Sequence, residues 1–211
     1  DIALENGAGF TLVQETEYPY DGRIRFTFEN VKSDTGFYLD IRVPGWAEKG
    51  TIQVGTRRME LTRAEAGSYQ KVYVEHPAET EVVVDFEMEV RYTVANTMVE
   101  ETVGQAAVER GPLVYCCEAA DVNVETLDDI YLDTDSEAKL CDIQIEGRTV
   151  QTLEIEAYCV NRTGYDREAL YQRWRFRGME KTALRFIPYF AWDNREFGEM
   201  RIWFPMLMKR I

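Results

Sequence analysis

The sequence has a single histidine and only four cysteines among its 211 residues. A Ser/His/Asp catalytic arrangement would have to be built around His76, which stands in a turn before Pro77, a position typical of surface residues. Four cysteines are too few for a disulfide scaffold at this length, and none has C-x-x-C spacing. The cysteines therefore leave the compartment open.

Basic residues and long apolar runs are also scarce. There are 24 Lys and Arg against 38 Asp and Glu, which gives a formal net charge of −14 and a pI near 4.6. Nucleic acids and anionic lipids are bound by neutralising their phosphates, so this balance argues against both. No apolar run approaches the roughly 20 residues that span a bilayer. We expect a soluble protein, cytoplasmic or periplasmic, with no nucleic acid and no membrane as partner.

A sustained helical period is missing as well, and alternation of apolar and polar residues takes its place. The segments "RIRFTFE" (23–29) and "FYLDIRV" (37–43) each predict a strand with one buried face. Further strands are expected at 51–54, 69–74, 81–94, 113–118, 140–147, 150–160, 182–190 and 199–204. The best helical candidate is "DREALYQRWRF" (166–176).

Turn signals separate these strands at short intervals, which is typical of all-β proteins. We predict two packed antiparallel β-sandwich domains, jelly-roll-like, with little helix. A polar stretch near 95–110 marks the expected seam, so the first sandwich is predicted over 1–100 and the second over 101–211. No Gly/Ser- or Pro-rich linker separates them.

The stretch "RGPLVYCCE" (110–118) raises the question of a metal or thiol site at Cys116 and Cys117. Adjacent strand residues point to opposite faces, so the two thiolates could share one zinc ion only across a bulge, and zinc would need two further ligands. Nothing nearby in the sequence activates a nucleophile. The favoured interpretation is a pair of small buried residues, with a zinc or thiol site as the alternative.

Two other stretches are candidate sites. "LDTDSEAKLCDI" (132–143) resembles a calcium loop, but it lacks the required glycine and the final glutamate, so a solvated acidic loop is favoured. "IPYFAWDNREFGEMRIWFP" (187–205) is rich in aromatic residues. Tyr189, Trp192 and Arg195 there, with Trp46 elsewhere, are the residue types that stack on sugars or fill interfaces, and they are the candidate carbohydrate contacts. Burial in the core is the competing interpretation.

Four segments together resemble the C-terminal region of glycoside hydrolase family 127, the β-L-arabinofuranosidase-like enzymes. They are "QETEYPYDGRIRFTFE" (14–29), "LDIRVPGWAE" (39–48), "AAVERGPLVYCCE" (106–118) and "IPYFAWDNREFGEMRIWFP" (187–205). The resemblance covers nearly the whole chain and keeps the order of the motifs. It is more specific than any of the motifs alone.

The resemblance implies that this chain is part of a longer polypeptide in which a different domain carries out catalysis. In that family an (α/α)6 barrel carries the chemistry of a retaining glycoside hydrolase, with a zinc held by three cysteines and a glutamate and a cysteine as nucleophile. Two β-sandwich domains follow the barrel. The family's Cys-Cys-Pro-Pro-Asn motif has no match here, since Cys116 and Cys117 precede Glu118 and Ala119.

This chain is therefore expected to be a non-catalytic piece that holds no cofactor and no catalytic or metal residue. The parent enzyme is expected to hold zinc. The expected partners are the barrel of the same polypeptide and, as an alternative, arabinose-containing glycans. Because the chain begins at Asp1 without a methionine, we expect it to be processed or excised from a longer protein.

Overall fold

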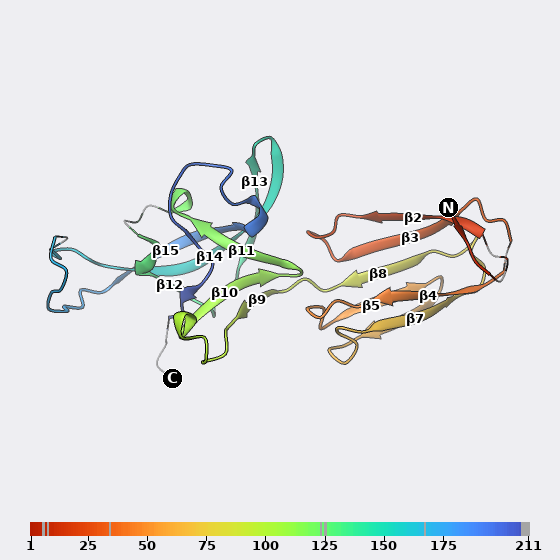
Figure 1. Cartoon of the computed structure of the whole chain (residues 1–211), viewed down its shortest axis with the longest axis horizontal. Helices are drawn as coiled ribbons and strands as arrows, with labels where there is room; N and C mark the ends of the chain where they lie inside the picture. The colour runs from red at the N-terminus through yellow and green to blue at the C-terminus, as the bar shows by residue number, and fades with distance from the viewer. Residues whose placement is uncertain are drawn as a thin grey trace. The chain divides into compact units, whose positions relative to one another are not determined.

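The computed structural model is an all-β protein that divides into two compact units, Asp1–Glu89 and Val90–Ile211 (Figure 1). It describes residues 1–5, 7, 9–33, 35–122, 124, 126–166 and 168–207. Within these residues the only helices are four single turns of 3-10 helix, and none is long and apolar enough to cross a membrane. The predicted all-β antiparallel class is confirmed.

The first unit contains a six-stranded antiparallel sheet in the order β1-β2-β3-β8-β5-β6 and a separate pair, β4-β7. Its strands are β1 (Ile2–Ala3), β2 (Gly9–Thr16), β3 (Arg23–Glu29), β4 (Phe37–Arg42), β5 (Gly50–Val54), β6 (Arg57–Leu61), β7 (Tyr69–Val74) and β8 (Val82–Phe86).

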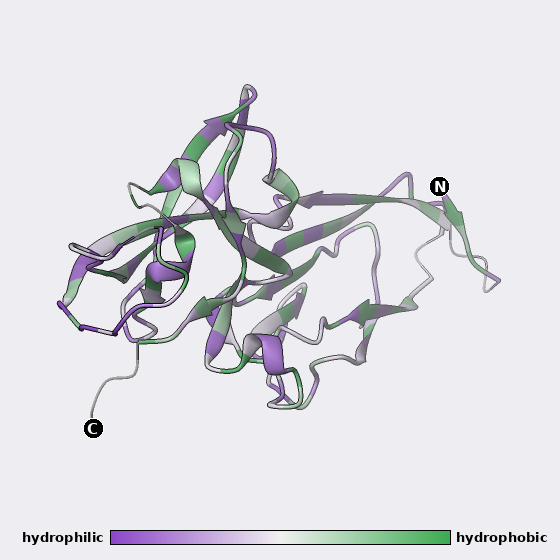
Figure 2. Ribbon diagram, turned by 60° about the vertical axis from the view of Figure 1, so that its left-hand side comes forward, coloured by the Kyte–Doolittle hydropathy of each residue, from purple (hydrophilic) through white to green (hydrophobic). Residues whose placement is uncertain are grey.

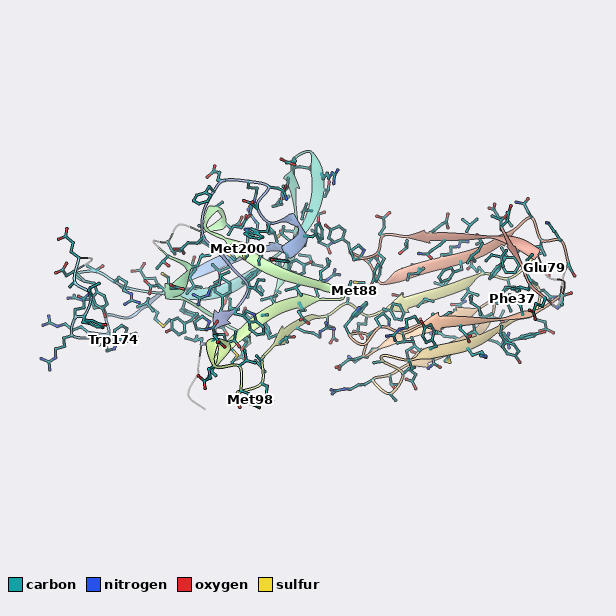
Figure 3. The ribbon with its side chains drawn as sticks, in the orientation of Figure 1. Phe37, Glu79, Met88, Met98, Trp174 and Met200 are labelled. Atoms are coloured by element: carbon teal, nitrogen blue, oxygen red, sulfur yellow. The ribbon has the colours of Figure 1, made fainter. Side chains whose placement is uncertain are left out.

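Both sheets of the first unit contribute to one core, as the alternating pattern predicts. Val82, Val84 and Phe86 of β8 are buried, while Val83 and Asp85 between them are not. Phe37 of β4, which Figure 3 labels, is stacked on Phe10 of β2. Their ring centroids lie 4.6 Å apart. Hydrophobic and hydrophilic residues alternate along the strands (Figure 2). The six-stranded sheet and the β4-β7 pair thus share a single apolar interior.

The second unit is built on a nine-stranded antiparallel sheet with the main path β12-β14-β15-β11-β10-β17 and three side strands, β9, β13 and β16. Its elements are β9 (Val90–Thr93), η1 (Glu100–Thr102), β10 (Gln105–Arg110), β11 (Leu113–Glu118), η2 (Ala119–Asp121), η3 (Leu127–Asp129), β12 (Ile130–Leu132), β13 (Lys139–Ile145), β14 (Arg148–Val160), β15 (Met179–Pro188), η4 (Tyr189–Ala191), β16 (Met200–Arg201) and β17 (Phe204–Pro205).

This sheet curls until the two ends of its path meet. Leu132 of β12 forms a parallel bridge with Met206, which follows β17, and the Leu207 N–H donates to the Leu132 carbonyl at 2.8 Å. The main core of the unit, including Tyr115, Phe186 and Phe204, is enclosed on the inner face. A smaller cluster around Cys116 and Ile187 lies apart from it. β11 therefore contributes side chains to two apolar clusters.

Three predicted elements differ from the structure. The strand predicted over 199–204 is two short strands, because β16 pairs with β11 and β17 with β10. The strand predicted over 81–94 is two strands, because β8 pairs with β3 and β5 in the first unit and β9 pairs with β10 in the second. The division between the units thus lies upstream of the seam expected near 95–110. The helix predicted over 166–176 is wrong for the described residues, which form an irregular loop.

Candidate functional site

The two adjacent cysteines of β11 point to opposite sides, as expected for neighbouring residues in a strand. Cys117 joins Tyr115 in the main core of the second unit, and Cys116 lies in the smaller cluster with Ile187. Both thiols are fully buried. The geometry separates the two sulfur atoms rather than pairing them.

Burial also suppresses ionisation of both thiols. It raises the pKa of the Cys116 thiol to about 12, and the nearby Glu118 carboxylate adds to this effect. Burial raises the pKa of Cys117 further. Among the residues that the structure describes, no group of three or more His, Cys, Asp and Glu side chains could hold a metal ion. At neutral pH both sulfurs are protonated thiols, which are poor nucleophiles and poor ligands.

An arginine and two acids form a buried ion cluster directly after these cysteines. The Arg195 guanidinium donates from Nε to Glu118 Oε2 at 2.8 Å and from Nη1 to Asp121 Oδ1 at 2.8 Å. The side chains of Arg195, Glu118 and Asp121 are 18%, 5% and 1% exposed. Hydrogen bonding to Asp121, followed by that to Glu118, raises the pKa of Arg195 above its usual value. The guanidinium therefore lies between two carboxylates that accept its hydrogen bonds.

This cluster anchors the loop 189–199, which follows β15 and which we call the aromatic loop. Glu118 Oε1 also accepts the backbone N–H of Asp193 at 3.2 Å, and Asn194 Nδ2 donates to the carbonyl of Trp192 at 3.1 Å. At the far end of the loop, the Glu199 carbonyl accepts the N–H of Ala119 at 2.8 Å. The loop is fixed to the end of β11 at several points, so its surface is preformed.

The aromatic loop presents four large rings to solvent. Tyr189 and Trp192 stack with centroids 5.8 Å apart and an interplanar angle of 14°. These two are about two-fifths exposed, Phe190 is more exposed, and Phe197 is fully exposed. An exposed apolar surface on an anchored loop is typical of an interaction site.

The predicted carbohydrate contacts come from both units. Tyr189, Trp192 and Arg195 share the aromatic loop, but the donors of Arg195 are directed to Glu118 and Asp121. Trp46 belongs to the first unit, where it is half-buried and packs edge-to-face on Phe86 at 5.8 Å. Sequence reasoning missed the two acids because they lie 77 and 74 residues from Arg195, and no local motif links them.

The acidic stretch 132–143 is held by internal hydrogen bonds. Asp133 is buried, its N–H donates to the Glu156 carbonyl at 3.1 Å, and its Oδ1 accepts the N–H of Asp135 at 3.2 Å. Ser136 donates its hydroxyl to the Asp133 carbonyl at 2.8 Å. These bonds form a turn between β12 and β13.

We predict that Cys116 and Cys117 do not react with a thiol reagent while the chain is folded. In a Cys141→Ser/Cys159→Ser variant, which removes the two half-buried cysteines, Ellman's reagent at pH 8 should label neither remaining thiol until denaturant is added. Both should then react, because unfolding restores solvent access and an ordinary pKa. Rapid labelling of the folded variant would contradict the buried positions.

We also predict that Arg195→Met destabilises the second unit by about 3–5 kcal/mol, because two buried carboxylates lose their hydrogen-bonded cation and only Asp121 keeps a second arginine, Arg185, at 3.8 Å. The measurement is urea unfolding of the 211-residue chain. Lys181→Met is the matched control: Lys181 is 57% exposed and pairs with Glu156 at 2.7 Å, so its loss should cost less than about 1 kcal/mol. Equal losses in the two variants would show that the cluster does not anchor the loop.

Comparisons with known proteins agree with the resemblance. Residues 2–88 match the β-L-arabinofuranosidase, GH127 middle domain, and residues 90–205 match the glycoside hydrolase family 127 C-terminal domain. Over 205 residues the chain is 28% identical to a non-reducing end β-L-arabinofuranosidase of Bifidobacterium longum subsp. longum, covering 94% of this chain and 30% of that protein.

Solved structures give the same result. A GH127 β-L-arabinofuranosidase from Geobacillus stearothermophilus T6 superposes with a TM-score of 0.85 at 28% identity, covering 98% of this chain and 32% of that one. Another, described as a glycoside hydrolase, has a TM-score of 0.85 at 32% identity, covering 94% of this chain and 32% of its own. The chain spans about a third of the length of these relatives. It belongs to glycoside hydrolase family 127 and comprises that family's middle and C-terminal domains.

Proposed function

We propose that this chain is a non-catalytic accessory region of a β-L-arabinofuranosidase-like enzyme and that it packs on and supports the catalytic barrel of the same polypeptide. The observation that carries the proposal is the end-to-end match of its two units to the middle and C-terminal domains of the family. In this proposal the retaining, zinc-thiolate chemistry belongs to the barrel, so the zinc would be held there.

The aromatic loop is the surface best suited to this packing. Phe190 and Phe197 expose most of their rings, and burying a ring of this size against a partner contributes about 1.5–3 kcal/mol. The Arg195 cluster holds the loop in place before docking, which reduces the entropy lost on association. A rigid apolar surface of this kind favours a permanent partner.

Carbohydrate binding is the second candidate function, and the stacked rings of Tyr189 and Trp192 favour it. Two nearly parallel rings, each about two-fifths exposed, offer a flat face to the C–H groups of a sugar. Arabinose-containing glycans are the ligand class implied by the resemblance. In this role Arg195 would position the rings rather than touch the sugar.

The proposal predicts that the 211-residue chain alone does not hydrolyse a chromogenic β-L-arabinofuranoside. The same assay on a polypeptide that also carries the barrel should give turnover, because the barrel would supply the nucleophile. Turnover by this chain alone, retained after further purification, would refute the assignment as an accessory region.

A substitution on the aromatic loop tests the packing role separately. Phe197→Asp should leave the melting temperature of the 211-residue chain unchanged, because the ring is fully exposed. In the barrel-containing polypeptide it should lower the stability by about 1–3 kcal/mol, because a charge would replace a ring buried at the interface. Tyr171→Asp, at another exposed aromatic residue of the same unit, is the control. Equal melting temperatures of wild type and Phe197→Asp in the longer polypeptide would rule out this contact.

A further inference from the structure

A concave surface lies in the second unit, and none of its lining residues belongs to the aromatic loop. It is a cleft of about 620 Å³ beside the turn that follows β14, lined by that turn, by Asp129 of η3 and by Glu180, Lys181 and Thr182 of β15. Its volume is within the range of about 300–1,000 Å³ typical of small-ligand sites. The candidate contacts predicted from the sequence include none of its lining residues.

Arg162 lies in one wall of the cleft and contacts one acid and two aromatic rings. Its Nε donates to both carboxylate oxygens of Asp129, at 2.9 and 3.0 Å. The guanidinium carbon lies 5.2 Å from the ring centroid of Tyr165 and 5.9 Å from that of Trp174. Trp174 lies in the loop that carries Arg173, Arg175 and Phe176 (Figure 3). Bidentate pairing and cation–π contacts together fix the wall.

The turn itself is also ordered by hydrogen bonds. Asn161 Oδ1 accepts the N–H of Thr163 at 2.9 Å, and the N–H of Tyr165 donates to the Arg162 carbonyl at 3.0 Å. Gly164 has a φ of +78°, a left-handed conformation that glycine adopts without strain. The cleft is therefore shaped by the fold before any ligand binds.

The charges of the cleft cancel, which indicates the class of ligand. Two acids, Asp129 and Glu180, and two bases, Arg162 and Lys181, line it. Arg162 is paired with Asp129, Lys181 with Glu156 at 2.7 Å, and Glu180 accepts from the amide of Asn161 at 3.1 Å. An ionic ligand would have to break these pairs, whereas a neutral ligand can use the remaining donors and acceptors.

We infer that this cleft binds a neutral oligosaccharide. Sugar hydroxyls both donate and accept hydrogen bonds, which matches a wall of carboxylate, guanidinium, ammonium and amide groups. Tyr165 and the small apolar surface of Val160 face the same cleft and suit the C–H groups of a sugar ring. The inference does not depend on whether the two units pack on a barrel.

Isothermal titration calorimetry of the 211-residue chain with arabinotriose, xylotriose and galactotriose tests this inference. At least one of these neutral sugars should bind saturably, and a galacturonic acid trimer should bind less well.

Two substitutions in the cleft test its location. Thr182→Trp, which fills the cleft from β15, and Tyr165→Ala should each weaken binding by about tenfold or more. Melting curves report whether each variant is folded. If Tyr165→Ala is unfolded, the affinity of Thr182→Trp tests the inference. That variant should fold, because none of the hydrogen bonds described above uses the Thr182 side chain.

Two controls separate the cleft from other surfaces. Tyr171→Ala removes an aromatic ring of the same loop that does not line the cleft, and Trp192→Ala removes the stacked ring of the aromatic loop. Tyr171→Ala should leave the affinity unchanged, whereas Trp192→Ala reports whether the second candidate sugar surface, on the aromatic loop, binds the trimer instead of the cleft. The inference is overturned if no neutral trimer binds, if the acidic trimer binds best, if a folded Thr182→Trp binds normally, or if Trp192→Ala abolishes binding.

Discussion

The ion cluster of Arg195 with Glu118 and Asp121 is the interaction on which the surface of the second unit depends. A buried charge is costly unless it is paired and hydrogen-bonded, and here one guanidinium serves two carboxylates that are almost fully buried. Glu118 ends β11, Asp121 lies in η2 just after it, and the arginine lies in the loop after β15. The cluster therefore joins segments that are distant in sequence. It thereby fixes where the rings of Tyr189, Phe190, Trp192 and Phe197 lie.

The same end of β11 shows how the fold uses the two adjacent cysteines. Its two cysteines are directed to separate apolar clusters, and burial keeps both thiols protonated. The side chains that could act on a ligand lie instead on the aromatic loop and in the cleft beside Arg162. Both surfaces belong to the unit that matches the C-terminal domain of family 127, and the other unit matches the middle domain.

Local alternation predicted many of the strands, though not β2, β6, β10 or β12. It also predicted the opposite orientations of Cys116 and Cys117, because these follow from the two-residue period of a strand. Local alternation did not predict which strands pair with one another in a sheet. Nothing in "EVVVDFEMEVRYTV" reveals that β8 and β9 join different sheets. In the described residues, 166 and 168–176, the predicted helix does not form. The Gln172 side-chain amide hydrogen-bonds the backbone N–H and the carbonyl of Asp166, and Leu170 is almost fully exposed. The Arg195 cluster depends on contacts across more than 70 residues, beyond any local pattern.

The central claim is that the anchored aromatic loop is a preformed surface for the barrel. Amide hydrogen exchange of residues 189–199 tests it most directly, by comparing the 211-residue chain with a polypeptide that also contains the barrel. If the loop packs on the barrel, its solvent-facing amides should exchange more slowly in the longer polypeptide, while those of the loop 166–176 keep their rate. Identical exchange of residues 189–199 in the two proteins would contradict the claim.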